Sequence, residues 1–222
     1  FKELRHESKL CFLYLSIFPE DYEINAEKMI HLLVAEGFIQ EDEEMMMEDM
    51  ARYYIDELID RSLVKAERIE RGKVMSCKIH DLLRDVIIKK AKELNFVNIY
   101  NEKHHSSAVC RREVVHHLVN DRVLCDRRVN KQMRSFLFIG ERTGMVGGFV
   151  YTTNLKLKLL RVLNLGGLWI SNKRYIYKSL PDVIGDLIHL RYLGIADTSV
   201  ISLPASISNL RFLQTLDASG NT

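Results

Sequence analysis

Histidine and aspartate meet at a point where a strand pattern changes into a helix pattern. Between Val74 and Lys90, apolar residues alternate as far as Ile79 and then follow helical spacing. His80 and Asp81 lie at this joint, and a helix N-terminus presents unpaired N–H groups and partial positive charge. Such an end attracts anions such as phosphate, to which a histidine can donate, while Asp81 is suited to capping the first turn. A capped helix with a packed histidine is the alternative.

Other groups capable of chemistry lack the required spacing. The adjacent pairs His104-His105 and His116-His117 flank a cysteine, but neighbouring histidines do not both face one metal in regular structure, so no metal site is expected. The glycine-rich segment 140–148 reads as a flexible loop, because it lacks the Lys-Ser or Lys-Thr of a phosphate loop. No Gly-x-Ser-x-Gly occurs either. We therefore expect no catalytic residues and no independent enzyme activity.

The composition is that of a water-soluble globular protein. The chain has 222 residues, 47% hydrophobic and 28% charged, and its longest apolar runs are too short to cross a bilayer. No signal-peptide pattern opens it, and no Cys-x-x-Cys pair occurs. Reduced thiols and a cytoplasmic location are expected. The cysteines are Cys11, Cys77, Cys110 and Cys125.

The first 95 residues predict three helices, two strands and a closing helix. Leu4–Asp21 reads as a helix ended by Pro19, and Asn25–Phe38 as a second with Asn25 as N-cap and Gly37 as stop. In the third, six residues should share the packed side, and the methionines at 45–47 should pack flexibly at its start. Two strands then join through Gly72. The six residues are Met46, Met50, Tyr53, Tyr54, Leu58 and Ile59.

This order of elements is that of a winged helix-turn-helix, which often binds DNA. Its third helix would enter the major groove, yet it is strongly acidic. From Glu20 to Asp60 the chain carries 14 acidic residues against two basic ones, so phosphates would be repelled. No DNA binding is expected. The acidic side chains on this helix are Glu48, Asp49, Asp56, Glu57 and Asp60.

A repeat organises the end of the chain. Four apolar positions from Leu187 to Ile195 recur 23 residues later, as does the Leu-Pro pair at 180–181, which is the period of leucine-rich repeats. An earlier unit lies 30 residues upstream, with the extra residues expected around 168–177, and Asn221 takes the position that turns the chain after a strand. Two further predicted strands, in 112–119 and 133–140, start the same sheet as degenerate units.

The ordered motifs resemble a known family. Lys9–Asp21 resembles a Cys-Phe-x-Tyr-x-x-x-Phe-Pro motif, and Ile79-His80-Asp81 resembles a Met-His-Asp motif, of plant intracellular immune receptors with coiled-coil, nucleotide-binding (NB-ARC) and leucine-rich repeat domains. Isoleucine for methionine conserves volume. The resemblance implies a switch in which ADP holds the resting state through His80 on its β-phosphate, with Ile79 and Asp81 as supporting motif residues.

The resemblance also sets expectations for partners. ADP or ATP would bind the intact receptor, with weak ATPase activity there left open, and not this piece tightly. The implied partners are the nucleotide-binding and helical domains of the same chain, a pathogen effector or viral protein, a host guard target, and other copies on activation. Membrane association of the activated receptor is left open. The rival reading is a repeat scaffold or adaptor without nucleotide.

The expected fold is α+β and multidomain. A winged-helix domain spans 1–95, a basic linker with a degenerate first repeat strand spans 96–134, and the start of a leucine-rich repeat α/β solenoid spans 135–222. Because both ends interrupt a pattern, a longer protein is expected. The basic surplus near 110–115 and 125–134 could pair with the acidic module, remain solvated, or contact nucleic acid or acidic lipid.

Overall fold

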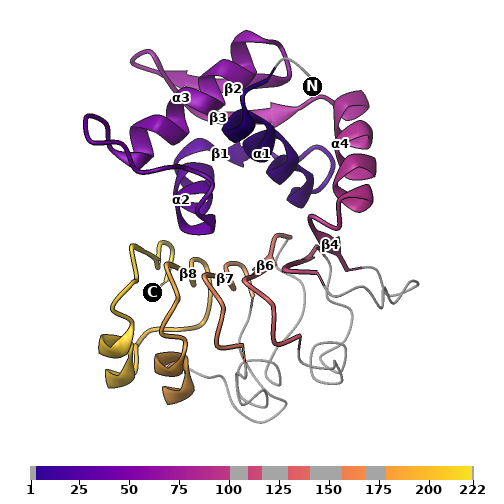
Figure 1. Ribbon diagram of the computed structural model, residues 1–222. Coiled ribbons are helices and arrows are strands. Elements are labelled where there is room, and N and C mark those ends of the chain that lie inside the picture. The colour runs from indigo at the N-terminus through magenta and orange to yellow at the C-terminus, as the bar shows by residue number, and fades with distance from the viewer. Residues whose placement is uncertain (1–3, 101–109, 117–129, 141–156, 169–178, 222) are drawn as a thin grey trace. The chain divides into compact units, whose positions relative to one another are not determined.

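The chain forms two compact units, Phe1–Val97 and Asn98–Thr222, in a computed structural model (Figure 1). The structure describes residues 4–100, 110–116, 130–140, 157–168 and 179–221. Most of the glycine-rich segment and of the predicted repeat insertion lies outside these ranges. The same is true of Cys125, His104, His105 and His117. The predicted linker 96–134 contributes strands to the second unit.

Four helices build the first unit, in the predicted order. α1 (His6–Tyr14) continues into the 3-10 turn η1 (Leu15–Ile17) before Pro19. α2 (Ala26–Glu36) begins where the Asn25 side chain accepts the N–H of Lys28 at 2.9 Å, and it ends at Gly37 with φ 77°. α3 (Met47–Asp60) and α4 (Asp81–Glu93) follow.

A three-stranded antiparallel sheet accompanies these helices. β1 (Ile24–Asn25), β2 (Val64–Glu70) and β3 (Lys73–Ile79) lie in the order β1-β3-β2, so that β3 is central. The hairpin turns at Gly72, whose φ of 76° lies in the left-handed region that glycine adopts without strain. The winged-helix architecture expected from the sequence is confirmed.

The packed side of α3 differs from the predicted one, because it includes Ala51 and Ile55 and excludes Tyr53. Ala51, Tyr54, Ile55 and Leu58 are its buried residues, whereas Tyr53 is 46% exposed. Tyr53 precedes Tyr54 by one residue, which turns it about 100° away from the buried stripe.

The predicted packing of the methionines at the start of α3 is wrong for Met45 and Met46. These side chains are 46% and 70% exposed. Both precede Met47, where the helix begins, so the helix does not hold them against the core.

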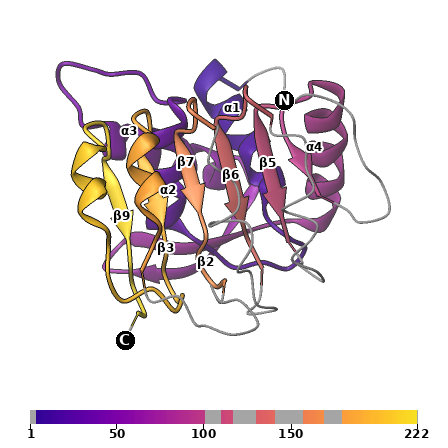
Figure 2. The same ribbon diagram turned by 90° about the horizontal axis from the view of Figure 1, so that it is seen from below.

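The second unit is a six-stranded parallel sheet in the order β4-β5-β6-β7-β8-β9, and Figure 2 shows β5, β6 and β7 side by side. Neighbouring strands pair in register, with Arg112 opposite Ser135, Val162 opposite Tyr192, and Tyr192 opposite Thr215. The 23- and 30-residue offsets predicted from the sequence are thus confirmed. The strands are β4 (Asn98–Ile99), β5 (Arg112–Val115), β6 (Ser135–Phe138), β7 (Val162–Asn164), β8 (Tyr192–Gly194) and β9 (Thr215–Asp217).

Leucine side chains fill the interior of each repeat. Leu163 and Leu193 are at most 2% exposed, and the 3-10 turns η2 (Asp182–Asp186) and η3 (Ala205–Asn209) follow the repeated Leu-Pro pairs. Behind the strands, Ser179 and Ser202 form an isolated parallel bridge. This is the leucine-rich repeat solenoid that the sequence predicts.

Asn221 bridges two repeats at the turn after β9. Its amide nitrogen donates to the carbonyl of Ile195 at 2.9 Å, and its side-chain oxygen accepts the N–H of Thr198 at 2.8 Å. Thr198 occupies the equivalent position one repeat earlier, and its hydroxyl donates to Ile195 at 2.7 Å. The predicted turning role of Asn221 is confirmed.

The Ser8–Glu57 hydrogen bond between α1 and α3 should make stability depend on pH. Ser8 is buried, and its hydroxyl, followed by Arg61, lowers the pKa of Glu57 against the opposing effect of burial. Ser8→Ala should lower the free energy of unfolding by about 1–2 kcal/mol at neutral pH. Because the folded-state pKa is depressed, this loss should shrink as the pH falls through it. Urea unfolding at neutral and at acidic pH, followed by circular dichroism, measures the free energy of unfolding of the wild type and of the variant.

Ser16→Ala is the matched control for that experiment. The Ser16 hydroxyl is buried and donates to the neutral carbonyl of Leu13 at 2.7 Å. Loss of this hydrogen bond should lower the free energy of unfolding by the same amount at neutral and at acidic pH. A pH-independent effect of Ser8→Ala would contradict the assigned role of the Glu57 carboxylate.

Two leucines at one repeat position should differ in their contribution to stability. Leu193 and Leu216 are register partners, but their exposures are 0% and 42%. Leu193→Ala should cost roughly 2–5 kcal/mol because it opens a cavity, whereas Leu216→Ala should cost about 1 kcal/mol or less. Denaturant midpoints measure the difference, and equal losses would refute the assignment of the core.

Candidate functional site

The joint between β3 and α4 is held by strand pairing on both sides of β3. Ile79 pairs with Val64 of β2 and is 4% exposed, while Cys77 pairs with Ile24 of β1 and is 1% exposed. Burial also raises the pKa of the Cys77 thiol to about 12, so it stays protonated at neutral pH. Because Ile79 and Cys77 are both buried and paired, they fix the point at which the next residue, His80, leaves the sheet.

His80 is the N-cap of α4, and its side chain is exposed. Its backbone is extended, with φ −72° and ψ 136°, and its carbonyl accepts the N–H groups of Leu83 and Arg84 at 2.9 Å each. The imidazole makes no capping hydrogen bond. The alternative of a packed histidine is therefore wrong, because the His80 side chain is exposed although the residue before it, Ile79, is buried.

Asp81 does not cap the helix as the sequence suggests. It is the first helical residue, one position beyond the N-cap, and no side-chain cap hydrogen bond is formed. Its carboxylate lies in the first turn, where negative charge interacts favourably with the helix dipole. The amides of Asp81 and Leu82 precede the first backbone hydrogen bonds of α4 and so face outward from the helix end.

The apolar residues of α4 are only partly buried. Ile87 and Ala91 form the packed stripe, whereas Leu82 and Val86 are 73% and 62% exposed. The helical spacing predicted for this segment is confirmed. Its helical pattern could not show which apolar side would be covered.

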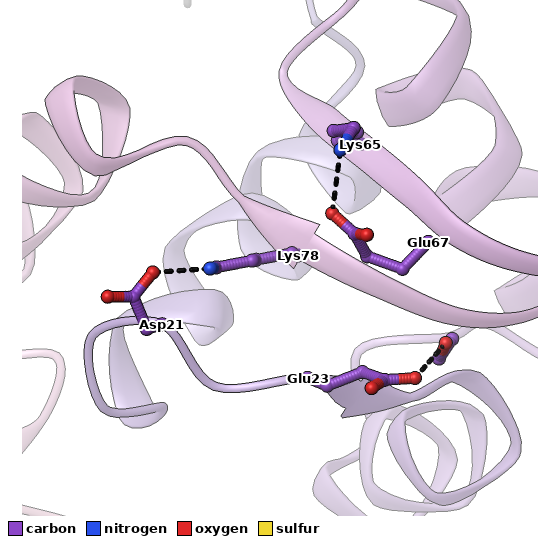
Figure 3. A network of polar contacts seen from close by, with 6 residues as sticks. Asp21, Glu23, Lys65, Glu67 and Lys78 are labelled. Carbon is purple, nitrogen blue, oxygen red and sulfur yellow. Dashed lines mark hydrogen bonds and ion pairs between the residues drawn. The ribbon is translucent and has the colours of Figure 1, made fainter.

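Lys78 adds a cation that the sequence analysis did not select. It lies two residues before His80 on β3, and alternation along a strand places such residues on one face. Its ammonium donates to Asp21, as Figure 3 shows, and Asp21 adopts a left-handed φ of 58°. The 57-residue separation between Lys78 and Asp21 hides this pair from sequence inspection.

Two lysines face each other across the hairpin near the site. Lys65 is the register partner of Lys78, and like charges in that position repel. Each lysine has an acidic partner: Lys65 contacts Glu67 at 3.0 Å, and Lys78 contacts Asp21 (Figure 3). The Asp21 hydrogen bond, with further contributions from Asp81 and Glu67, raises the pKa of Lys78. Lys78 thus offsets the acidic groups around the helix start.

A second polar contact ties the same loop to β3. The hydroxyl of Ser76 donates to the Glu23 carboxylate, and Ser76 is 2% exposed. Figure 3 shows Glu23 in this contact, beside the Asp21–Lys78 pair. The loop before β1 is therefore held to the central strand at two points.

The arrangement suits an anionic ligand and offers no nucleophile or metal cluster. An exposed imidazole at a helix N-terminus, with a lysine two residues away, can donate to phosphate oxygens. Within the described ranges, no group of three or more His, Cys, Asp or Glu side chains could hold a metal ion. Cys11, Cys77 and Cys110 are buried.

Comparison with known proteins identifies both units. Residues 17–87 match the disease resistance protein winged helix domain, and residues 132–222 match a leucine-rich repeat region. The chain therefore carries the two-domain arrangement of a disease resistance protein.

Curated relatives narrow this class. "Putative disease resistance RPP13-like protein 3" of Arabidopsis thaliana is 81% identical over 100% of this chain and 26% of its own length. "Putative disease resistance RPP13-like protein 2" is 67% identical over 100% of this chain and 26% of its own length, and "Disease resistance protein RPP13" is 65% identical over 100% and 25%, both from the same plant. The chain is thus similar throughout its length to RPP13-like disease resistance proteins, and it spans about a quarter of these relatives' length.

The sequence motifs also indicate closeness to the tomato mosaic virus resistance protein of tomato. The comparisons show similarity to RPP13-like proteins and do not support that protein specifically. A solved leucine-rich repeat protein of Leptospira interrogans is 16% identical, with a TM-score of 0.37, over 50% of this chain and 25% of that one. Similarity at this level carries no information about function. In the described part of the chain, no helix is long and apolar enough to cross a membrane.

Asp21→Asn should lower the pKa of Lys78 towards its ordinary value. The substitution removes the negative charge of the side chain that accepts the Lys78 hydrogen bond, the largest cause of the raised pKa. Titration of the lysine side-chain signals by NMR measures the shift. Glu23→Gln is the matched control, since its partner is Ser76, and it should leave Lys78 unchanged. An unchanged Lys78 in the Asp21 variant would refute the ion pair.

Proposed function

We propose that this chain is the winged-helix and first-repeat portion of a plant immune receptor that switches between ADP- and ATP-bound states. His80 would donate a hydrogen bond to the β-phosphate of ADP in the resting receptor. The observation that carries this proposal is the exposed imidazole at the N-cap of α4, which makes no capping hydrogen bond of its own.

The residues around His80 are compatible with a diphosphate. The first amides of α4 face outward from the helix end, and Lys78 reduces the negative potential that Asp21 and Asp81 would otherwise create. ADP would supply the negative charge that favours the closed state. A contact made in one state only shifts the equilibrium between two states by its differential free energy. One charged hydrogen bond of roughly 1.5–3 kcal/mol shifts populations by about one to two decades.

The remaining parts of the proposal come from the family resemblance. The nucleotide would be held chiefly by nucleotide-binding and helical domains of the same receptor, so this chain alone would bind ADP or ATP weakly. The repeats would restrain the switch and contribute to recognition of a pathogen protein or a guarded host protein. Activated receptors would oligomerise. The resting receptor would be cytoplasmic, and the chain itself would not be an enzyme.

His80→Ala in the full-length receptor should weaken the resting state. The exposed ring makes no capping hydrogen bond, so its removal should cost the fold little while abolishing the phosphate contact. Retained ADP after purification should fall by about tenfold or more, and cell-death signalling without pathogen should rise. Nucleotide content by chromatography and expression in leaves measure these two outcomes.

His6→Ala is the matched control, because His6 is an exposed histidine of the same unit at the start of α1. It should leave both readouts at the wild-type level. If His80→Ala also left ADP retention and signalling unchanged, the nucleotide role would be refuted. The remaining reading would be a repeat scaffold that binds partner proteins without nucleotide.

A further inference from the structure

Among the described residues of the second unit, basic side chains are confined to one end of the strands. In the described part of this unit, every lysine and arginine lies at the first residue of a strand or within the four residues before it. Four of the five acidic residues in the same part lie at or beyond the strand ends or in η2, and the fifth, Glu113, is buried. Charge is therefore polarised along the strand direction.

Four arginines form a row across neighbouring strands. The N–H of Arg134 donates to the carbonyl of Arg111 at 2.7 Å, Arg161 donates in the same way to Arg134 at 2.7 Å, and Arg191 donates to Arg161 at 2.8 Å. The parallel strands β5 to β8, side by side in Figure 2 where labelled, thus bring these residues into register. Adjacent strands lie about 4.8 Å apart, so the row repeats at that interval.

A second row lies three residues earlier in each repeat. It contains Lys131, Lys158 and Arg211, all exposed, with Ile188 at the equivalent position between Lys158 and Arg211. We call these two rows together the strand-entry strip, which consists of Arg111, Arg134, Arg161, Arg191, Lys131, Lys158 and Arg211.

Exposed apolar side chains are mixed with this strip. Leu159, Ile188 and Phe212 are 45%, 51% and 59% exposed. Phe212 stacks on His189 at 6.4 Å between ring centroids. The surface therefore offers cations and apolar contacts together.

Nothing in the sheet requires arginine at these positions. Gln214 takes the next place in the row and makes the same backbone bond, to the carbonyl of Arg191 at 2.8 Å. Like charges on adjacent strands repel and reduce stability. In the described ranges, Arg111, Arg134 and Arg191 form no ion pair with an acidic side chain. The unbalanced charge is a cost that a bound anion would remove.

We propose that the strand-entry strip binds an extended acidic segment, with apolar side chains among its carboxylates, of a partner protein. Guanidinium groups form paired hydrogen bonds with carboxylates, and a segment crossing the strands would meet one arginine per repeat. The aliphatic Leu159 and Ile188 favour a polypeptide over single-stranded nucleic acid, which stacks its bases on aromatic rings.

The test uses the complete chain and a fluorescein-labelled twelve-residue peptide of alternating glutamate and leucine. Fluorescence anisotropy should show saturable binding that weakens with added salt. The triple variant R111Q/R134Q/R191Q should bind about tenfold more weakly, as expected for loss of three charge contacts, one from the exposed Arg111 and two from the half-buried Arg134 and Arg191. Gln214 shows that glutamine is compatible with this position, and circular dichroism verifies the fold.

The matched control is the triple variant R68Q/K89Q/K92Q, which removes the same charge from exposed positions of the first unit. It should bind the peptide as the wild type does. If both variants bound the peptide equally weakly, net charge alone would explain the loss of binding, and the proposal would be overturned.

Three further outcomes would also overturn the proposal. The first is tighter binding to an oligouridylate or to phosphatidylserine vesicles than to the peptide. The second is no binding to the wild type at low salt. The third is peptide binding only after Glu41, Asp42, Glu43 and Glu44 are changed to their amides, because the strip would then be occupied by the chain's own acidic segment.

Discussion

The pairing of β3 between β1 and β2 is the constraint on which the first unit depends. Val64 opposite Ile79 and Ile24 opposite Cys77 set which side chains of β3 enter the core. A slip of one residue would reverse every side chain, burying Lys78 and His80 and exposing Ile79. Burying two polar groups would cost far more than the hairpin could recover. The outward position of His80 thus follows from hydrophobic register and not from any interaction of its own ring.

A similar constraint governs the second unit at a larger scale. Each repeat places its leucines in the interior by pairing with the repeat before it, and buried Leu163 and Leu193 are direct register partners. The same register aligns whatever residue comes just before each strand. A residue type that recurs at that position therefore forms a row on the surface. In this way four arginines, each separated from the next by 23 to 30 residues, come together.

The helices, strands and repeats were predicted well from the sequence, because capping residues, turn residues and the repeat spacing can be read directly from it. Asn25 and Gly37 marked the ends of α2, Gly72 marked the hairpin, and the 23-residue offset marked the repeats. The helical pattern of α4 did not reveal that Leu82 would be exposed, since coverage depends on which neighbouring elements pack against the helix. The Lys78–Asp21 ion pair and the missing cap at Asp81 were likewise hidden, because both depend on distances set by the folded chain.

The buried thiols of the first unit have a practical consequence. Burial raises the pKa of both Cys11 and Cys77 to about 12, and their exposures are 0% and 1%. Neither sulfur can form a thiolate or meet an alkylating reagent while the helices and sheet remain closed. The rate at which such a reagent modifies them therefore reports how often this unit opens, without any label being introduced.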